Sequence, residues 1–384
     1  MYKQECYKIF TRKSLYLTFL LFIFFMLLPD GSHSIRQTST YQSLYDEWRG
    51  PLTATEIDMA NERLMKLEEQ VDREMAEADE LEGVFPKSIE DQAAHSVYVS
   101  VIQAGENINW FEARKENLRD KAFHPTETAY QAEVAQMEFE LLQQLNEPIG
   151  FYQTTTWSST VDFINTLGFI FLTVLIILGL APVFADEHSQ KVASLIVSTK
   201  FGKTKVAFAK IFASITYIGV LFVSLHVINV LIEISKFGRF VDGTVPLQNL
   251  YLFIQSPFSL TIWQYYALAL GIQLLASLMI GLLVLFLSII TRHAMLTFFI
   301  SGTIIGTPVL FRQLGLDQQL IQHMTQFSYA ELMRVKGLVD QFIVFRLLGQ
   351  PILYPYLLIA VFLLIASLNV LLIYWQYRNQ QIVN

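Results

Sequence analysis

The sequence predicts an all-α fold: a polytopic membrane protein with six transmembrane helices and a large α-helical extracellular insertion between the first and the second. The chain of 384 residues is 53% hydrophobic and only 16% charged, whereas about 25% of the residues of soluble proteins are charged. Its charge is also divided unevenly. Residues 30–161 hold 25 acidic and 10 basic residues, and the rest of the chain holds 9 acidic and 17 basic. These observations indicate an acidic soluble segment inserted into a membrane protein that is otherwise basic.

Residues 1–29 are expected to form a cytoplasmic N-terminus and the first transmembrane helix. Four basic residues precede an apolar run over 15–28. This run is shorter than the ~20 residues that span a bilayer as a helix. The same features, followed by Ser-His-Ser at 32–34, are also typical of a cleaved signal peptide, so the sequence leaves both interpretations open. Both interpretations place the next segment outside the cell.

Residues 30–160 are expected to form an extracellular acidic helical domain. Thr53 to Glu56 and Ser88 to Asp91 have the spacing of capping boxes, which begin helices. The apolar periodicity predicts helices over 56–81, over 89–123 with Gly105 weakening the middle, and from 125 to about 148. The sequence does not decide whether this domain gates a pathway, captures a substrate, binds a partner or serves only as a spacer.

Residues 161–384 are expected to form a transmembrane domain. Its five apolar helices are predicted at about 163–185, 206–233, 265–290, 294–311 and 354–374. Residues 235–264 and 312–352 return to the outer side, and the second of these has some helical periodicity. The basic residues near the N-terminus and between the second and third spans place both termini in the cytoplasm. This orientation is that of a multi-pass protein of the cell membrane.

Residues 186–205 link the second and third spans and carry the most informative pattern of the chain. Val192, Leu195, Ile196 and Thr199 follow the spacing of one helix face. Gly202 stands where a helix stop is expected, and lysines at 200, 203 and 205 precede the next span. A short amphipathic helix with a basic tail suits lying at the membrane interface or docking a partner. The simpler alternative is a solvated basic loop that only follows the positive-inside rule.

This segment resembles the cytoplasmic coupling segment of ABC-2 type exporter permeases. It has an acidic pair, a basic residue, Ser-Leu-Ile-Val-Ser-Thr at 194–199, Gly-Lys at 202–203 and Ala-Lys-Ile at 209–211. The likeness is close over residues 186–210 and loose over the six-span layout. Where the family often has Gly-Thr, this chain has Val192-Ala193, which leaves the subfamily open.

The resemblance implies that a cytoplasmic ABC ATPase subunit docks on residues 186–205. The residues it assigns to this contact are Glu187, Lys191, Leu195, Ile196, Ser198, Thr199, Lys200, Gly202 and Lys203. The family also keeps its first membrane helix, so we expect residues 1–29 to be retained. Two copies of the permease, or one copy and a paralogue, would enclose the pathway in the bilayer.

Nucleotide binding by this chain itself is not expected. Gly202-Lys203-Thr204 matches the end of a phosphate-binding loop, but the full motif needs a glycine at the position of Val197. No cofactor is therefore expected on this chain, and ATP and Mg would be held by the partner ATPase. The sequence also lacks the usual motifs of metalloproteases and serine hydrolases, so we expect no catalytic residue, no metal site and no nucleic-acid partner.

His226 and Asn229 are candidates for the substrate pathway, because polar residues at membrane depth are often functional. The structural alternative is that His226 only hydrogen-bonds a neighbouring helix. Taken together, the sequence predicts the non-enzymatic permease subunit of an ATP-binding cassette exporter that moves a peptide, drug-like or lipid-like substrate. The alternative is a membrane sensor or assembly factor whose extracellular domain binds a ligand or partner. The substrate, and whether the permease pairs with itself or a paralogue, cannot be predicted from the sequence.

Overall fold

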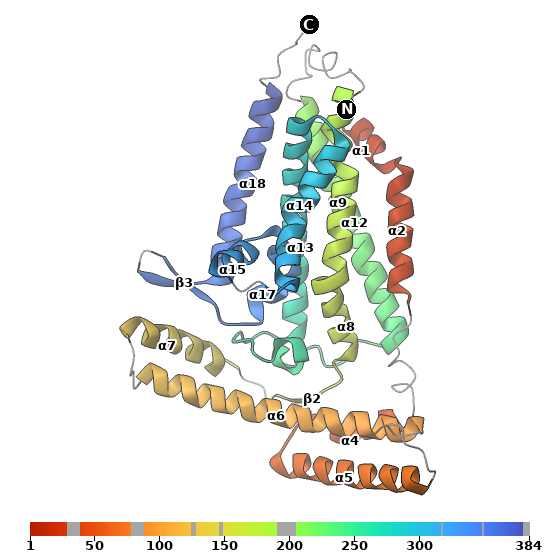
Figure 1. The fold of residues 1–384 in the computed structure, drawn as a ribbon, viewed down its shortest axis with the longest axis vertical. Coiled ribbons are helices and arrows are strands. Elements are labelled where there is room, and N and C mark those ends of the chain that lie inside the picture. Colours follow the sequence, from red (N-terminus) through yellow and green to blue (C-terminus); the bar gives the residue numbers. More distant parts are fainter. Residues whose placement is uncertain are drawn as a thin grey trace.

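The computed structural model describes residues 1–28, 39–77, 88–123, 128–145, 149–189, 205–315, 318–347 and 349–378. Within these residues the protein is mostly helical, with two small two-stranded sheets, which agrees with the predicted helical class. A bundle of long apolar helices forms one part of the molecule, and a layer of helices lies across one end of it (Figure 1).

Five helices of the described residues are long and apolar enough to cross a membrane. They are Thr155–Ser189, α12 (Lys205–Phe237), α13 (Ile262–Thr291), α14 (Ala294–Gln313) and Tyr354–Gln376 within α18 (Tyr354–Arg378). The first of these helices is central to the bundle. Of its most apolar stretch of 18 residues, 72% is buried, whereas the corresponding share is 17% for α14 and 22% for α18. The other described residues therefore leave most of the apolar stretches of α14 and α18 uncovered.

The central helix is interrupted. It consists of α8 (Thr155–Phe163), the π-helical turn η1 (Ile164–Gly168), α9 (Phe169–Leu180) and α10 (Pro182–Ser189). A π-turn inserts one extra residue per turn and leaves backbone carbonyls accessible to side-chain donors, which makes such turns frequent at functional positions.

The N-terminal apolar run is too short to cross a membrane by itself. Helices α1 (Tyr2–Phe10) and α2 (Lys13–Met26) reach the length and hydropathy of a span only together, and they are bent by 54° at residues 11–12. The described residues thus have five candidate spans, or six if this bent pair is one span, and the sixth remains a prediction. Helix α1 and the C-terminal end of α18 lie at the same end of the bundle (Figure 1).

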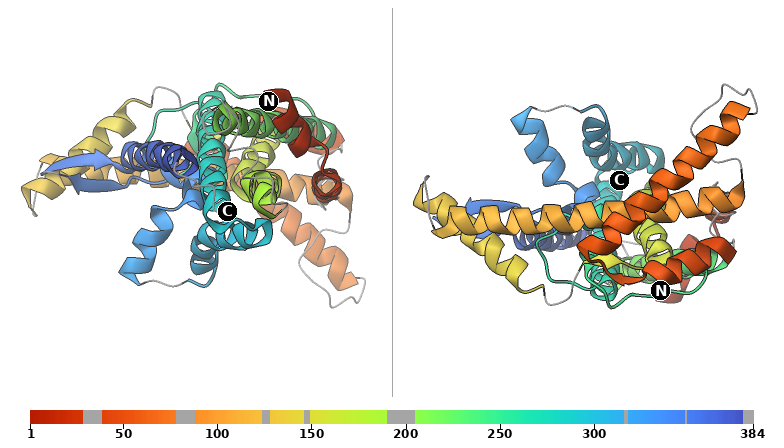
Figure 2. Two further views of the ribbon diagram at one scale, coloured as in Figure 1. Left: turned by 90° about the horizontal axis from the view of Figure 1, so that it is seen from above. Right: turned by 90° about the horizontal axis from the view of Figure 1, so that it is seen from below.

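The layer at the other end of the bundle comes from the predicted acidic domain. Its helices are α4 (Ser39–Trp48), α5 (Ala54–Glu77), α6 (Ile89–Phe123) and α7 (Ala129–Gln143). Helix α5 crosses beneath α6, as Figure 2 shows from below. Two separate apolar clusters hold this layer together, one among α4, α5 and α6 and one between α6 and α7. The sequence did not predict α4, which lies in the first of these clusters.

Two helices of this layer begin where the capping motifs predict. Glu56 N donates to Thr53 Oγ1 at 3.4 Å, and Thr53 N donates back to the Glu56 carboxylate at 2.7 Å. These hydrogen bonds from Thr53 hold the pKa of the Glu56 carboxyl below its usual range. Asp91 N likewise donates to Ser88 Oγ at 2.9 Å. Both boxes satisfy backbone groups that a helix start otherwise leaves unpaired.

The layer is attached to the bundle by backbone pairing and by polar contacts. Strand β1 (Gly50–Pro51) pairs antiparallel with β2 (Gly150–Phe151), so the two ends of the insertion meet. The Asp242 carboxylate accepts from Arg49 and from Gln153 N, the latter at 2.9 Å. Arg114 donates to the carbonyl of Gln255 at 2.7 Å. These contacts join both ends and the middle of the layer to the loop between α12 and α13.

The segment between α14 and α18 is more varied than its helical periodicity suggested. It contains α15 (Gln319–Gln326), α16 (Tyr329–Arg334), α17 (Lys336–Val339) and the hairpin of β3 (Val344–Leu347) and β4 (Gln350–Leu353). Arg312 at the end of α14 pairs with the buried Glu331 of α16 at 3.0 Å. Val335 has a positive φ of 51°, which allows the sharp turn between α16 and α17.

Candidate functional site

The predicted coupling segment joins α10 to α12. Helix α10 ends at Ser189 and α12 begins at Lys205. Of the nine residues assigned to ATPase docking, Glu187 lies on α10. The other eight lie outside the described residues: Lys191, Leu195, Ile196, Ser198, Thr199, Lys200, Gly202 and Lys203. The structure therefore describes this site through its two flanking helices, α10 and α12.

A buried cluster of charges joins these two helices to the N-terminus. The side chain of Lys210 on α12 is completely buried. Its Nζ donates to Glu5 Oε2 at 3.1 Å and to the carbonyl of Val183 at 2.7 Å. It also lies 2.8 Å from Glu187 Oε1, as an ion pair by distance. One ammonium group on α12 thus contacts both α1 and α10.

A second set of contacts surrounds this cluster. Lys8 Nζ lies 2.8 Å from Glu5 Oε1 and 3.6 Å from Glu187 Oε1, so two ammonium groups share two carboxylates. Arg12, at the bend between α1 and α2, donates to the carbonyl of Gly179 at 2.9 Å and to Asp186 Oδ2 at 3.1 Å. Helix α1 is consequently fixed against α10 and α12 beside the predicted coupling segment. We call Glu5, Lys8, Glu187 and Lys210 the charge cluster.

Of this cluster, only Glu187 was predicted as a site residue, although Lys210 is the lysine of the Ala-Lys-Ile motif at 209–211. Lys210 gives a signal in the sequence, because it is the only Asp, Glu, Lys or Arg between Lys205 and Glu233. Glu5 gives a second, as the only acidic residue of the basic N-terminus. Periodicity cannot pair them, since the two residues are 205 positions apart.

His226 belongs to a buried hydrogen-bond network inside the bundle. Its Nε2 lies 2.8 Å from Gln273 Oε1 on α13, and its Nδ1 lies 3.0 Å from the carbonyl of Phe222. Gln273 in turn donates to the carbonyls of Ile164, in the π-turn, and Met333, on α16, at 3.1 and 3.3 Å. The hydrogen bond expected between His226 and a neighbouring helix is therefore present.

Asn165 in the π-turn continues this link toward the segment between α14 and α18. Its Oδ1 accepts from the backbone N–H of Lys336 at 2.8 Å, and its carbonyl accepts from Arg334 Nε at 3.2 Å. The polar residues within the bundle thus connect α12 and α13 to the turn between α16 and α17. Because these elements share hydrogen bonds, a shift of one of them would strain or break bonds to the others.

Asn229 differs from His226. It is 1% exposed, and neither its amide nitrogen nor its amide oxygen has a hydrogen-bond partner among the described residues. Glu233, one turn further along α12, is also buried, and its Oε2 has no hydrogen-bond partner there. Buried polar groups are normally satisfied, so these two side chains leave hydrogen-bonding capacity unused inside the helix bundle.

In the part of the chain that the structure describes, no group of three or more His, Cys, Asp or Glu side chains could hold a metal ion. Comparison with known proteins gives no match to a family model, to a curated protein or to a solved structure.

Proposed function

We propose that this chain is the permease subunit of an ATP-binding cassette exporter in the cell membrane. The observation that carries the proposal is the charge cluster, which lies directly beside the predicted coupling segment. Residues 186–205 link α10 to α12 along the chain, and Lys210 connects both helices with α1. A partner that moves this segment would therefore move α1, α10 and α12 together.

The proposed partner is a cytoplasmic ABC ATPase that binds ATP and Mg. Its closure would displace α10 and α12, and α10 continues through α9 to the π-turn at the centre of the bundle. The network around Gln273 offers a route from there to α16. The uncovered surfaces of α14 and α18 are suited to lipid and to a second permease copy or paralogue. In this arrangement both termini are cytoplasmic and residues 30–160 are extracellular.

Variants of the coupling segment test this function. Leu195→Asp combined with Ile196→Asp places two charges on the predicted docking face, so the ATPase should no longer co-purify, or its activity should lose its response to substrate. Lys200→Gln should have a much smaller effect, since an exposed charge contributes about 0–1 kcal/mol. Gly202→Val should be intermediate, because it disfavours the turn that ends the helix.

The measurements are co-purification from native membranes and ATPase activity, at matched membrane levels of each variant. A double-aspartate variant that assembles and transports like the wild type would exclude the docking role. If the segment is only a basic loop, the order is reversed, and the lysine variant should be the one that fails to insert.

A second candidate function is a membrane sensor or assembly factor. It is favoured by a polar cavity between the outer helices and the bundle, which suits an extracellular ligand. The two functions are distinguished by whether an ATPase subunit accompanies the purified protein.

A further inference from the structure

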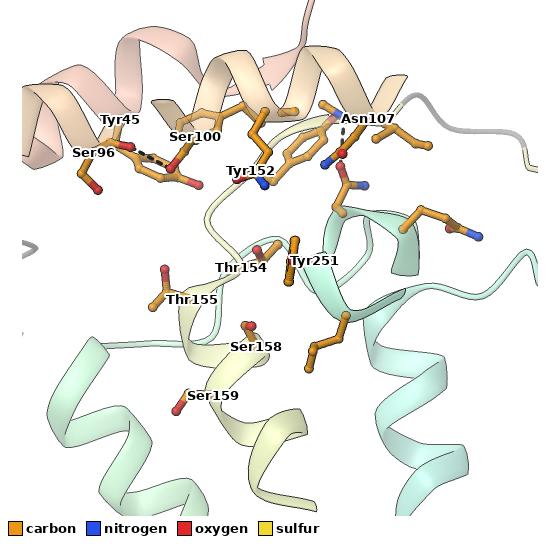
Figure 3. Close-up of a pocket in the computed structure, with 18 of the residues that line it drawn as sticks. Tyr45, Ser96, Ser100, Asn107, Tyr152, Thr154, Thr155, Ser158, Ser159 and Tyr251 are labelled. Atoms are coloured by element: carbon orange, nitrogen blue, oxygen red, sulfur yellow. Dashed lines mark hydrogen bonds between the residues drawn. The ribbon is translucent and has the colours of Figure 1, made fainter. Parts of the chain in front are cut away.

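A cavity of about 500 Å³ lies between the outer helix layer and the end of the bundle (Figure 3). Tyr45 of α4 and Ser100 and Asn107 of α6 lie on one side, and Thr155 of α8 and Tyr251 lie on the other. Its volume falls within the roughly 300–1,000 Å³ that is typical of small-molecule sites. The lining comes from both parts of the molecule, so the cavity exists only where the layer meets the bundle.

The cavity lining is almost uncharged. Asp162 is the only Asp, Glu, Lys, Arg or His among the described residues that line it, although residues 30–161 hold 25 acidic residues. Most other lining side chains carry a hydroxyl or an amide, and four are tyrosines. Hydroxyls and amides both donate and accept, and tyrosine adds a flat apolar face. Such a surface suits a neutral ligand with many hydroxyl groups better than an ionic or a purely apolar ligand.

Gln248 borders this cavity with an amide that its hydrogen bonds hold in place. The residue lines the cavity and is 2% exposed. Its Nε2 donates to the carbonyls of Ser256 and Phe258 at 2.9 and 3.0 Å, so the amide cannot be turned around without losing both bonds. Its Oε1 is then left as an acceptor with no hydrogen-bond partner among the described residues. This oxygen is itself buried, so Gln248 adds a fixed polar group to the wall of the cavity and not an acceptor that a ligand reaches.

We propose that this cavity binds a neutral saccharide, either a free oligosaccharide or the sugar headgroup of a glycolipid. The hydroxyls of a sugar donate and accept at successive positions, which matches the mixture of serine, threonine, asparagine and glutamine side chains. The apolar faces of its rings match the tyrosines. An uncharged peptide is the less suitable ligand, because its side chains need apolar subsites. The inference does not depend on export, since binding to the cavity requires no ATP.

Binding to the full-length purified protein tests the proposal. Maltotriose and triacetylchitotriose are titrated by calorimetry into protein in detergent, and nanodiscs with and without diglucosyl diacylglycerol form the second arm. We expect saturable binding in at least one arm. Binding in detergent indicates a free oligosaccharide, whereas binding only in glycolipid nanodiscs indicates a headgroup.

Three variants locate the binding. Ser100→Arg places a long charged side chain in the cavity, and Tyr251→Ala removes an aromatic face, so each should weaken binding at least about fivefold. Both residues are exposed, so the fold should tolerate the changes. Tyr356→Ala is the matched control, because Tyr356 is similarly exposed and lies outside the cavity.

The proposal is overturned if neither arm shows saturable binding, or if Ser100→Arg and Tyr251→Ala bind sugar as the wild type does. It is also overturned if an acetylated, amidated tetrapeptide binds with the same dependence on these variants while the sugars do not. Loss of ATPase co-purification would leave all of these outcomes unchanged, so this test and the test of export fail separately.

Discussion

At the scale of single residues, Lys210 and Gln273 each join several helices through buried polar contacts. Lys210 is a fully buried ammonium held by carboxylates from α1 and α10. Taking a charge out of water is costly, and its partners compensate only while they are present. Gln273 satisfies polar groups on three other elements at once. Each residue therefore allows a test in which one substitution removes a partner of several buried groups.

Lys210→Met should destabilise the protein by up to about 3–5 kcal/mol, because it leaves the buried carboxylates of Glu5 and Glu187 with only the half-exposed ammonium of Lys8. The triple variant Lys210→Met, Glu5→Gln, Glu187→Gln should recover a large part of this loss. The measurement is the thermal unfolding of the purified protein in detergent. Lys66→Met is the control, since Lys66 pairs with Glu62 on an exposed helix surface, where solvent screens the charges and the pair contributes little to stability. Equal unfolding temperatures for the two single variants would contradict the importance of the charge cluster.

Gln273→Leu should cost more stability than His226→Leu. The first change leaves two carbonyls and the His226 ring without their partner, whereas the second leaves only Gln273 Oε1. Hydrogen bonds between membrane helices average about 0.6 kcal/mol and reach about 1.7 kcal/mol, so the two variants should differ by about 1–3 kcal/mol. Ser367→Ala, which removes one exposed bond within α18, should be close to wild type. The reverse order of unfolding temperatures would show that Gln273 does not hold the network together.

At the scale of secondary-structure elements, the start of a helix is determined by residues close in the sequence, whereas the contacts between helices are not. The capping boxes at Thr53 and Ser88 begin α5 and α6 as predicted. Gly105, in contrast, was expected only to weaken α6. A Cβ at this position would lie 2.5 Å from Cδ1 of Ile57, so the glycine permits the close packing of α5 on α6. The effect of this glycine on stability therefore depends on the packing of α5 against α6, and not on α6 alone.

Gly105→Ala should therefore destabilise the outer helix layer, although alanine favours an isolated helix by about 1 kcal/mol. Overpacking of this kind typically costs about 1–3 kcal/mol. The double variant Gly105→Ala, Ile57→Ala should be more stable than the sum of the two single changes predicts, because the smaller side chain makes room for the new methyl group. Thermal unfolding of all three variants measures this coupling, and strict additivity would show that the two helices are not in close contact there.

At the scale of the whole molecule, α1 and the outer helix layer lie at opposite ends of the bundle. Five membrane-length helices between them are consistent with a membrane protein whose two ends meet different compartments. The layer is attached through β1, β2 and the loop between α12 and α13, so it and the bundle form the cavity together. The orientation in the membrane follows from the basic residues of the sequence and remains a prediction.

Labelling of single cysteines tests this orientation. Cys6 is the only cysteine, so Cys6→Ala provides the background. Cysteines at Ser88 and Gln318 should react with an impermeant thiol reagent added to intact cells, and one at Ser198 should react only after permeabilisation. Labelling at Ser198 in intact cells would reverse the orientation and with it the proposed docking role.

The sequence by itself determined the features that depend on neighbours along the chain. Hydropathy located the long apolar helices, and side chains three residues apart located the capping boxes, because both signals are complete within a few turns. The tertiary structure alone decided which polar groups meet. Glu5 and Lys210 are 205 positions apart, Gly50 and Phe151 pair across the whole insertion, and the lining of the cavity comes from both parts of the fold. No local pattern encodes such contacts, since they form only when packing brings distant helices together and buried polar groups must find partners.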